Sequence, residues 1–133
     1  MRQPVLHETP NPSRASFRGS FRFAFQGVAY VVRTQRNFRI HMAVASLAIL
    51  AAIALRVPAA EVAIIVVCAM VVFAAEMFNT VVEAIVDLVT NSYHPLAKIA
   101  KDVAAGAVLV SAAGSVLVGI LVLGPYLWHA LVR

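Results

Sequence analysis

Apolar residues fill three long segments of this sequence, and short polar stretches separate them. The segments cover residues 38–57, 59–89 and 95–131. Each reaches the roughly 20 residues that an α-helix needs to cross a bilayer. Pro58 closes the first segment because proline cannot continue a helical hydrogen-bond ladder, and Pro95 suits the first turn of the third. The pattern predicts three membrane-spanning helices, with Gly124-Pro125 ending or kinking the last.

A shorter segment with helical periodicity, residues 16–35, precedes these three segments. Aromatic and branched side chains recur at helical spacing, and basic and amide side chains fall largely on the other side: Phe17, Phe21, Phe25, Val28 and Val32 against Arg18, Arg22, Gln26 and Arg33. This pattern predicts an amphipathic helix lying in the membrane interface, aromatic side down. The alternative is a helix packed against other protein.

Composition limits the class of protein. The chain has 133 residues, of which 62% are hydrophobic and 13% charged, and a soluble domain of that size could not hide so much apolar surface. Residues 1–15 are rich in proline and polar side chains and predict a disordered tail. Residues 16–133 then form a single, all-α integral membrane domain.

Charge is concentrated at one end of the chain. Seven arginines and one glutamate precede His41, within a net charge of +5. Beside membrane helices this favours an anionic lipid surface over nucleic acid as the partner. Because Arg and Lys mark the cytoplasmic side, the N-terminal region and the loop before Lys98 and Lys101 are expected there. The C-terminus is expected outside, as three crossings require.

Five polar side chains interrupt the second apolar segment. Their spacing places them within an arc of roughly 100° on one helix face: Glu76, Asn79, Thr80, Glu83 and Asp87. A stripe of this kind facing lipid is costly, so it is expected to line a cavity or a helix interface. Counted from Val62, Glu76 lies ~21 Å and Glu83 ~31 Å along the axis. The stripe therefore lies near the cytoplasmic edge of a hydrocarbon core ~30 Å thick.

These side chains suit phosphate and metal chemistry. Two carboxylates with an amide between them can hold Mg²⁺ and accept a proton, and lysines at the start of the third helix, Lys98 and Lys101, can clamp phosphate oxygens. The alternative is that the charges pair across helices and only fix the bundle; Lys98 and Asp102 also have the spacing of a simple surface pair. In the preceding loop, Tyr93 and His94 are candidates for nucleotide contacts or for interfacial anchors. The chain has no GxxxxGK[ST] or GxGxxG loop, which excludes the familiar soluble nucleotide folds.

The polar stripe and its flanks resemble a known family. The segment Glu76-Met-Phe-Asn79-Thr80-Val-Val-Glu83-Ala-Ile-Val86-Asp87 is similar to the E-x-[apolar]-N-[ST]-x-[apolar]-E-x-x-V-D signature of prokaryotic diacylglycerol kinases. The segments from Asn37 to His41 and from His94 to Val108 look like the undecaprenol kinase branch. The resemblance extends from about Ser16 to Gly119.

The resemblance implies an activity and an assembly. It implies a homotrimer in the bacterial plasma membrane, with active sites between subunits at the cytoplasmic face. It implies Mg²⁺-ATP as phosphoryl donor and a lipid hydroxyl as acceptor, with undecaprenol preferred and diacylglycerol as the alternative. Carried over by position, Glu76 is the expected general base and Glu83 a metal ligand. Asn79, Lys101 and Asp102 match positions near the phosphates. Asp87 and His94 match positions near the nucleotide, and Lys98 is a further candidate for nucleotide binding.

Two positions depart from the family pattern. Gln35 stands where the family usually has a metal-binding glutamate, and Ser92 where it often has an acid. An amide is a weaker ligand than a carboxylate for a hard cation. The Gln35 departure raises the alternative of an inactive relative that binds lipid or nucleotide without turnover. A small transporter is disfavoured, because its polar groups would also cross the midplane.

Overall fold

The described part of the chain, residues 17–90 and 92–132 of a computed structural model, forms four α-helices. They are α1 (Phe17–Thr34), α2 (Arg36–Ala54), α3 (Ala59–Val89) and α4 (Pro95–Leu131). The expected disordered tail, residues 1–15, lies outside the described residues. Three of the helices, α2, α3 and α4, are long and apolar enough to cross a membrane. The prediction of an all-helical protein with three candidate spans is confirmed.

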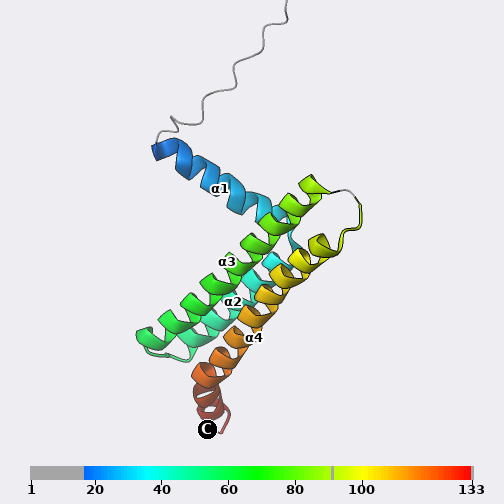
Figure 1. The fold of residues 1–133 in the computed structure, drawn as a ribbon. Helices are drawn as coiled ribbons and strands as arrows, with labels where there is room; N and C mark the ends of the chain where they lie inside the picture. The colour runs from blue at the N-terminus through cyan, green and yellow to red at the C-terminus, as the bar shows by residue number, and fades with distance from the viewer. Residues whose placement is uncertain (1–16, 91, 133) are drawn as a thin grey trace, which may run out of the picture.

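Helix α3 is the centre of the bundle. It packs along both α2 and α4, whereas α2 and α4 touch each other little. Helix α1 leaves the bundle at an angle, with only its C-terminal end against the other helices (Figure 1). The start of α2, the end of α3 and the start of α4 therefore lie at one end of the bundle, which we call the α1 end.

The elbow between α1 and α2 consists of one extended residue, Gln35, with φ −94° and ψ 112°. The Arg39 guanidinium reaches back from α2 and donates from Nη1 to the carbonyl oxygens of Val32 (3.2 Å) and Arg33 (3.0 Å). These carbonyls are among the last four of α1, which have no partner within their own helix. Arg39 thus joins the two helices at the elbow.

The turn at the opposite end explains why α2 stops at Ala54 and not at the expected residue 57. Arg56 has φ 56°, a left-handed conformation that a helix cannot contain. The Val57 N–H then donates to the Ala52 carbonyl at 2.9 Å. Val57 packs in a small apolar cluster with Ala52, Ile65 and Leu123, so this residue belongs to the turn and not to the span.

Helix α4 continues to Leu131 with Pro125 inside it, so Gly124-Pro125 does not end the helix. One residue later, the Tyr126 hydroxyl donates to Glu61 Oε1 of α3 at 3.0 Å. This hydrogen bond joins α3 and α4 at the end of the bundle away from α1. Interhelical bonds of this kind satisfy polar groups that lipid cannot.

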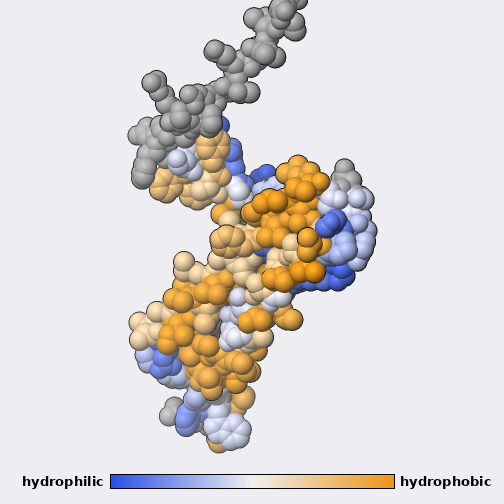
Figure 2. Space-filling model, viewed as in Figure 1, coloured by the Kyte–Doolittle hydropathy of each residue, from blue (hydrophilic) through white to orange (hydrophobic). Residues whose placement is uncertain are grey.

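The bundle exposes most of its large apolar side chains. Figure 2 shows apolar surface along the helices and hydrophilic surface at the two ends of the bundle, including the region around the loop that joins α3 and α4. Leu109, Leu117 and Leu121, for example, are all more than 60% exposed. Such a surface is stable against lipid or further protein, and not against water.

Candidate functional site

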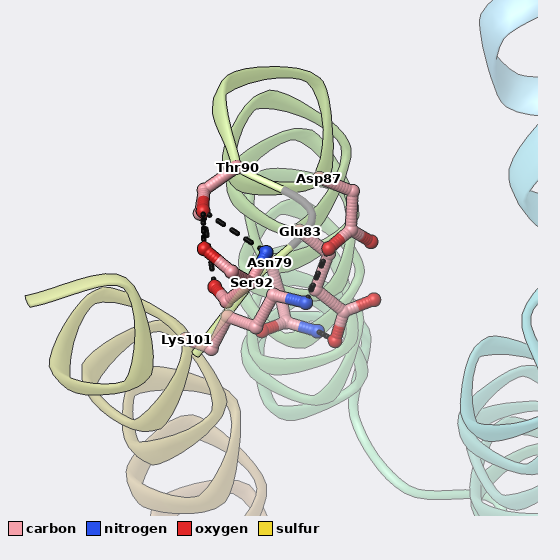
Figure 3. Close-up of polar contacts among 6 residues, drawn as sticks. All are labelled: Asn79, Glu83, Asp87, Thr90, Ser92 and Lys101. Atoms are coloured by element: carbon pink, nitrogen blue, oxygen red, sulfur yellow. Dashed lines mark hydrogen bonds and ion pairs between the residues drawn. The ribbon is translucent and has the colours of Figure 1, made fainter. Parts of the chain in front are cut away.

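The polar side chains singled out from the sequence gather at the α1 end of the bundle. Glu76, Asn79, Glu83 and Asp87 lie on the second half of α3, and the lysines Lys98 and Lys101 with Asp102 lie on the first two turns of α4. The antiparallel course of the two helices brings these segments side by side (Figure 3). Residues far apart in sequence therefore form one polar region.

The α3 stripe is most buried at Glu76 and exposed at Asp87, toward the end of the bundle. Glu76 and Thr80 are buried, Asn79 and Glu83 are partly buried, and Asp87 is exposed. The Thr80 hydroxyl donates to the Glu76 backbone carbonyl at 2.9 Å, a local bond that occupies its donor. The inner end of the stripe is thus protein-covered, and its outer end is open to small solutes.

The innermost carboxylate, Glu76, is 3% exposed. Its Oε1 lies 3.3 Å from Nε2 of His41 on α2, but the two are not aligned as a hydrogen bond, and Oε1 has no hydrogen-bond partner in the described chain. The sequence marked His41 only as part of a family segment. The spacing of residues along one helix cannot predict this contact, because it joins two different helices.

One turn outward, Asn79 and Glu83 form a pair. Asn79 Nδ2 donates to Glu83 Oε1 at 2.9 Å, as Figure 3 shows. The Asn79 Oδ1 atom is buried and has no hydrogen-bond partner among the described residues. Buried polar atoms are rarely left unpaired, so this oxygen is free to accept a donor or to ligate a cation.

At the outer end, α4 supplies positive charge to α3. Lys101 Nζ lies 2.6 Å from Asp87 Oδ1, and Lys98 pairs with Asp102 one turn away on α4. Both pairs are partly exposed, so each contributes little to stability. The pairing across helices that is the alternative to phosphate binding is therefore present for Lys101, and the alternative surface pair is present for Lys98.

These charged pairs border an open pocket of about 600 Å³ between the end of α3 and the start of α4. Its walls include the charged residues just described, together with Tyr93 and His94 of the connecting loop. A volume of this order lies within the usual range for small-molecule sites. The pocket places two lysines, each paired with an aspartate, beside the exposed Tyr93 ring. If the lysines exchange these partners for phosphate oxygens, the pocket suits phosphates with an attached ring system.

The loop that borders this pocket is stabilised by hydrogen bonds between its own residues. The Ser92 N–H donates to Thr90 Oγ1 at 3.2 Å, and the Thr90 hydroxyl donates to the Ser92 carbonyl at 3.0 Å. His94 Nδ1 accepts from the Leu96 N–H at 3.2 Å and caps α4. His94 therefore has a structural bond that its position in the motif did not reveal, and its Nε2 is the nitrogen left for a ligand.

The oxygens of Asn79 and Glu83 are the candidate ligands for Mg²⁺ at this site. In the described chain no three His, Cys, Asp or Glu side chains gather as a complete metal site. Mg²⁺ at nucleotide sites keeps several waters and takes one or two carboxylates plus substrate phosphates. The Glu83 carboxylate beside the unpaired Asn79 oxygen meets that smaller requirement. Gln35 lies at the elbow, half-buried, and its side chain makes no capping hydrogen bond to α2 that would hold it there.

Three candidate spans, with carboxylates, an amide and lysines gathered at one end of the bundle, define the class of multi-pass membrane proteins with a polar site. Comparison with known sequences shows to which family within that class the chain belongs. The sequence profile of the family "Prokaryotic diacylglycerol kinase" matches residues 22–123. The chain belongs to this family.

Two named relatives agree with the match. A diacylglycerol kinase from Synechocystis is 48% identical over 101 residues, which cover 75% of this chain and 58% of the relative. An undecaprenol kinase from Bacillus subtilis is 40% identical over 111 residues, covering 84% of this chain and 90% of the relative. The chain thus spans little more than half of the first relative and most of the second. Both relatives carry the names of lipid kinases, so the predicted enzyme class is confirmed through the family.

Proposed function

We propose that this protein transfers the γ-phosphoryl group of ATP to the hydroxyl group of a membrane lipid, with Mg²⁺ as cofactor. The observation that carries the proposal is the order of groups on α3. A buried carboxylate, Glu76, lies innermost, and the Asn79–Glu83 pair lies one turn outward. The lysine-lined pocket lies beyond that pair. A lipid hydroxyl arriving from the membrane and a triphosphate arriving from water meet between them.

The reaction follows from this order. The lipid hydroxyl gives its proton to the Glu76 carboxylate as its oxygen forms a bond to the γ-phosphorus. The bond from that phosphorus to the β,γ-bridging oxygen breaks, and ADP leaves with the electron pair. Catalysis then rests on positioning and on neutralising phosphate charge. Glu76 suits the role of base because its carboxylate Oε1 accepts no hydrogen bond from the described residues.

The outer residues hold the nucleotide in this proposal. Lys101 and Lys98 exchange their carboxylate partners, Asp87 and Asp102, for phosphate oxygens when ATP binds. Partly exposed ion pairs are weak enough for such exchange. The released Asp87 and the His94 imidazole then face the rest of the nucleotide.

Glu83 and Asn79 would hold Mg²⁺ through their oxygens, and Gln35 would approach the same ion from the elbow. The ion supplies neutralisation of phosphate charge when bound. The assembly that the family resemblance implies is a homotrimer. We propose that a neighbouring subunit completes each site, since the described residues of one chain offer few metal ligands. The site lies at the cytoplasmic face of the plasma membrane, where ATP is available.

The preferred acceptor is undecaprenol. The support is the resemblance of the segments around His41 and His94 to that branch, together with the undecaprenol kinase relative, which matches over most of its length. Diacylglycerol is the alternative acceptor, supported by the higher local identity to the diacylglycerol kinase relative. The two acceptors differ in the chemistry around the hydroxyl group, and assays with each lipid separately distinguish them.

Purified protein in mixed micelles, given labelled ATP and each lipid separately, tests the activity and the acceptor together. Glu76→Gln and Glu83→Gln should keep the oligomer size of the wild type and lower turnover by about 10²-fold or more, as expected for loss of a base or a metal ligand. Glu61→Gln, at the far end of α3, is the matched control and should keep turnover.

Each outcome has a separate meaning. Near-normal turnover in Glu76→Gln or Glu83→Gln would remove the assigned role of that residue. ATP binding without phosphorylation of either lipid would favour the inactive relative that Gln35 suggests.

A further inference from the structure

The contact between His41 and Glu76 has no place in the transfer step above. His41 Nε2 lies 3.3 Å from the buried Glu76 Oε1, an oxygen without a hydrogen-bond partner. That separation is slightly longer than an aligned N–H···O hydrogen bond. Hydrogen bonds at catalytic groups are often long before substrate binds and tighten afterwards. A small rotation of either side chain would close this one.

We propose that His41 is a positioning residue for the lipid kinase reaction. Its Nε2–H holds the Glu76 carboxylate in the one rotamer that presents the other oxygen to the lipid hydroxyl. This inference rests on the proposed function, because it assigns Glu76 as the base. It adds a residue from α2 to a reaction otherwise carried by α3 and α4.

The surroundings of His41 define the direction from which the hydroxyl comes. An apolar groove of about 320 Å³ runs between α2, α3 and α4, with His41 among its lining residues and with walls from Val44, Ala48, Val72, Phe73 and Gly119. Since His41 lines this groove and also contacts Glu76, the imidazole lies at the boundary between hydrocarbon-like surface and the carboxylate. Without it, an apolar wall would border Glu76, and the carboxylate would have no fixed orientation.

Nothing else in the described chain performs this task for Glu76. Thr80 donates to the Glu76 backbone carbonyl and not to its side chain, and Asn79 donates to Glu83. Orientation of a base by a second hydrogen-bonding group is a general feature of catalytic sites. Here the neighbour with that chemistry is His41.

The test compares substitutions at His41 in full-length protein in mixed micelles. His41→Leu removes the donor at similar size, and His41→Gln keeps an N–H at similar reach. We expect His41→Leu to lower kcat about tenfold or more, as misorientation of a catalytic group does, with the KM for ATP unchanged. His41→Gln should recover most of kcat. His129→Leu, the same substitution on an exposed histidine near the end of α4, is the control and should keep kcat.

A second comparison separates positioning from packing. In a Glu76→Gln background, His41→Leu should cause no further loss of the residual rate, because residues that act as a unit are not additive. If His41→Leu does not assemble, His41→Gln and His41→Asn decide, since asparagine is too short to reach Oε1 and should be the slower variant. Equal rates for the Gln and Asn variants, or independent losses in the double variant, would overturn the inference.

Failure of this inference differs from failure of the proposed function. A wild-type protein that phosphorylates no lipid contradicts the kinase proposal itself. Lipid phosphorylation by wild type with an equally active His41→Leu contradicts only the role of His41.

Discussion

In the proposed function, Gln35 is a residue whose chemistry affects how tightly the site holds Mg²⁺. It stands where the resembled family usually carries a glutamate, directly before α2. One charge pair at ~4 Å and an effective dielectric constant of ~20 amounts to roughly 4 kcal/mol before desolvation. Dehydration of the ion and the carboxylate cancels most of this. The net effect of a carboxylate there is on the order of 1 kcal/mol, or several-fold in affinity.

The corresponding prediction is that Gln35→Glu lowers the Mg²⁺ concentration needed for half-maximal kinase activity several-fold. A Mg²⁺ titration of wild type and variant measures it. Gln26→Glu, an exposed glutamine on α1, controls for added charge alone. An unchanged requirement in Gln35→Glu would mean that this side chain does not face the metal.

Arg56 is a second residue with a measurable consequence. Its φ of 56° costs an L-residue about 1 kcal/mol or more relative to glycine. Arg56→Gly should therefore raise the free energy of unfolding by about 1 kcal/mol, seen as a higher midpoint of thermal unfolding in detergent. Ala43→Gly, on an exposed face within α2, should shift the midpoint the other way. A lower midpoint for Arg56→Gly would show that the arginine side chain itself stabilises this turn.

At the scale of elements, the elbow between α1 and α2 controls where α1 lies. Arg39 donates to two carbonyl oxygens at the end of α1, and Gln35 contributes no side-chain cap. One guanidinium therefore contributes to the angle between α1 and the bundle, together with the packing of the end of α1, where Val31 is buried. This matters for function because Gln35 is expected to approach the metal from this elbow.

Removing that guanidinium should loosen α1. In Arg39→Met, the spread of distances between spin labels at Ala24 of α1 and Leu88 of α3 should broaden, because the two hydrogen bonds are lost. The measurement is a pulsed dipolar distance distribution on a Cys68→Ser background, with labelled protein diluted into unlabelled. Arg39→Lys keeps a cationic nitrogen that can donate to both carbonyls, but on a shorter side chain without the planar guanidinium, and should give an intermediate width. A distribution as narrow as wild type in Arg39→Met would assign the elbow to packing alone.

The helix bounds show which helix ends a local sequence pattern can predict. The bounds of α3 and α4 agree with their apolar runs and with Pro58 and Pro95 at their starts, because proline placement is a local signal. The end of α2 does not follow the apolar run. Val57 is apolar but belongs to the turn, and its burial with Leu123 of α4 is a tertiary contact that no local period reports.

At the scale of the whole molecule, the bundle has two unlike ends. The α1 end carries Arg33, Arg36 and Arg39, the two lysines and the candidate site, whereas the other end carries Arg56, Glu61 and the end of α4. The bias of Arg and Lys predicts that the α1 end is cytoplasmic. Three crossings then put the two termini on opposite sides.

Cysteine labelling tests that topology. On a Cys68→Ser background, an impermeant reagent added to intact cells should modify a cysteine placed after Arg133 and should not modify one placed at Ser13. Both positions should react once the membrane is permeabilised. Modification of the Ser13 position in intact cells, or of both positions, would contradict this direction of crossing.

The sequence by itself determined the class of protein, the three candidate spans and the residues of the α3 stripe. These follow from hydropathy and helical period, which depend only on neighbours along the chain. It also identified the family, because the residues that carry the resemblance stand in short continuous segments of the sequence. Its motif did not say which of those residues are paired.

Only the tertiary structure decided the partners: His41 beside Glu76, Lys101 on Asp87, Arg39 on the end of α1, and Tyr126 on Glu61. Each of these contacts joins groups of two different helices. Such contacts depend on the rotation and separation of helices in the bundle, which side-chain packing across the interfaces sets. A one-dimensional pattern carries no information about that rotation, so these partners became visible only once the helices were placed together.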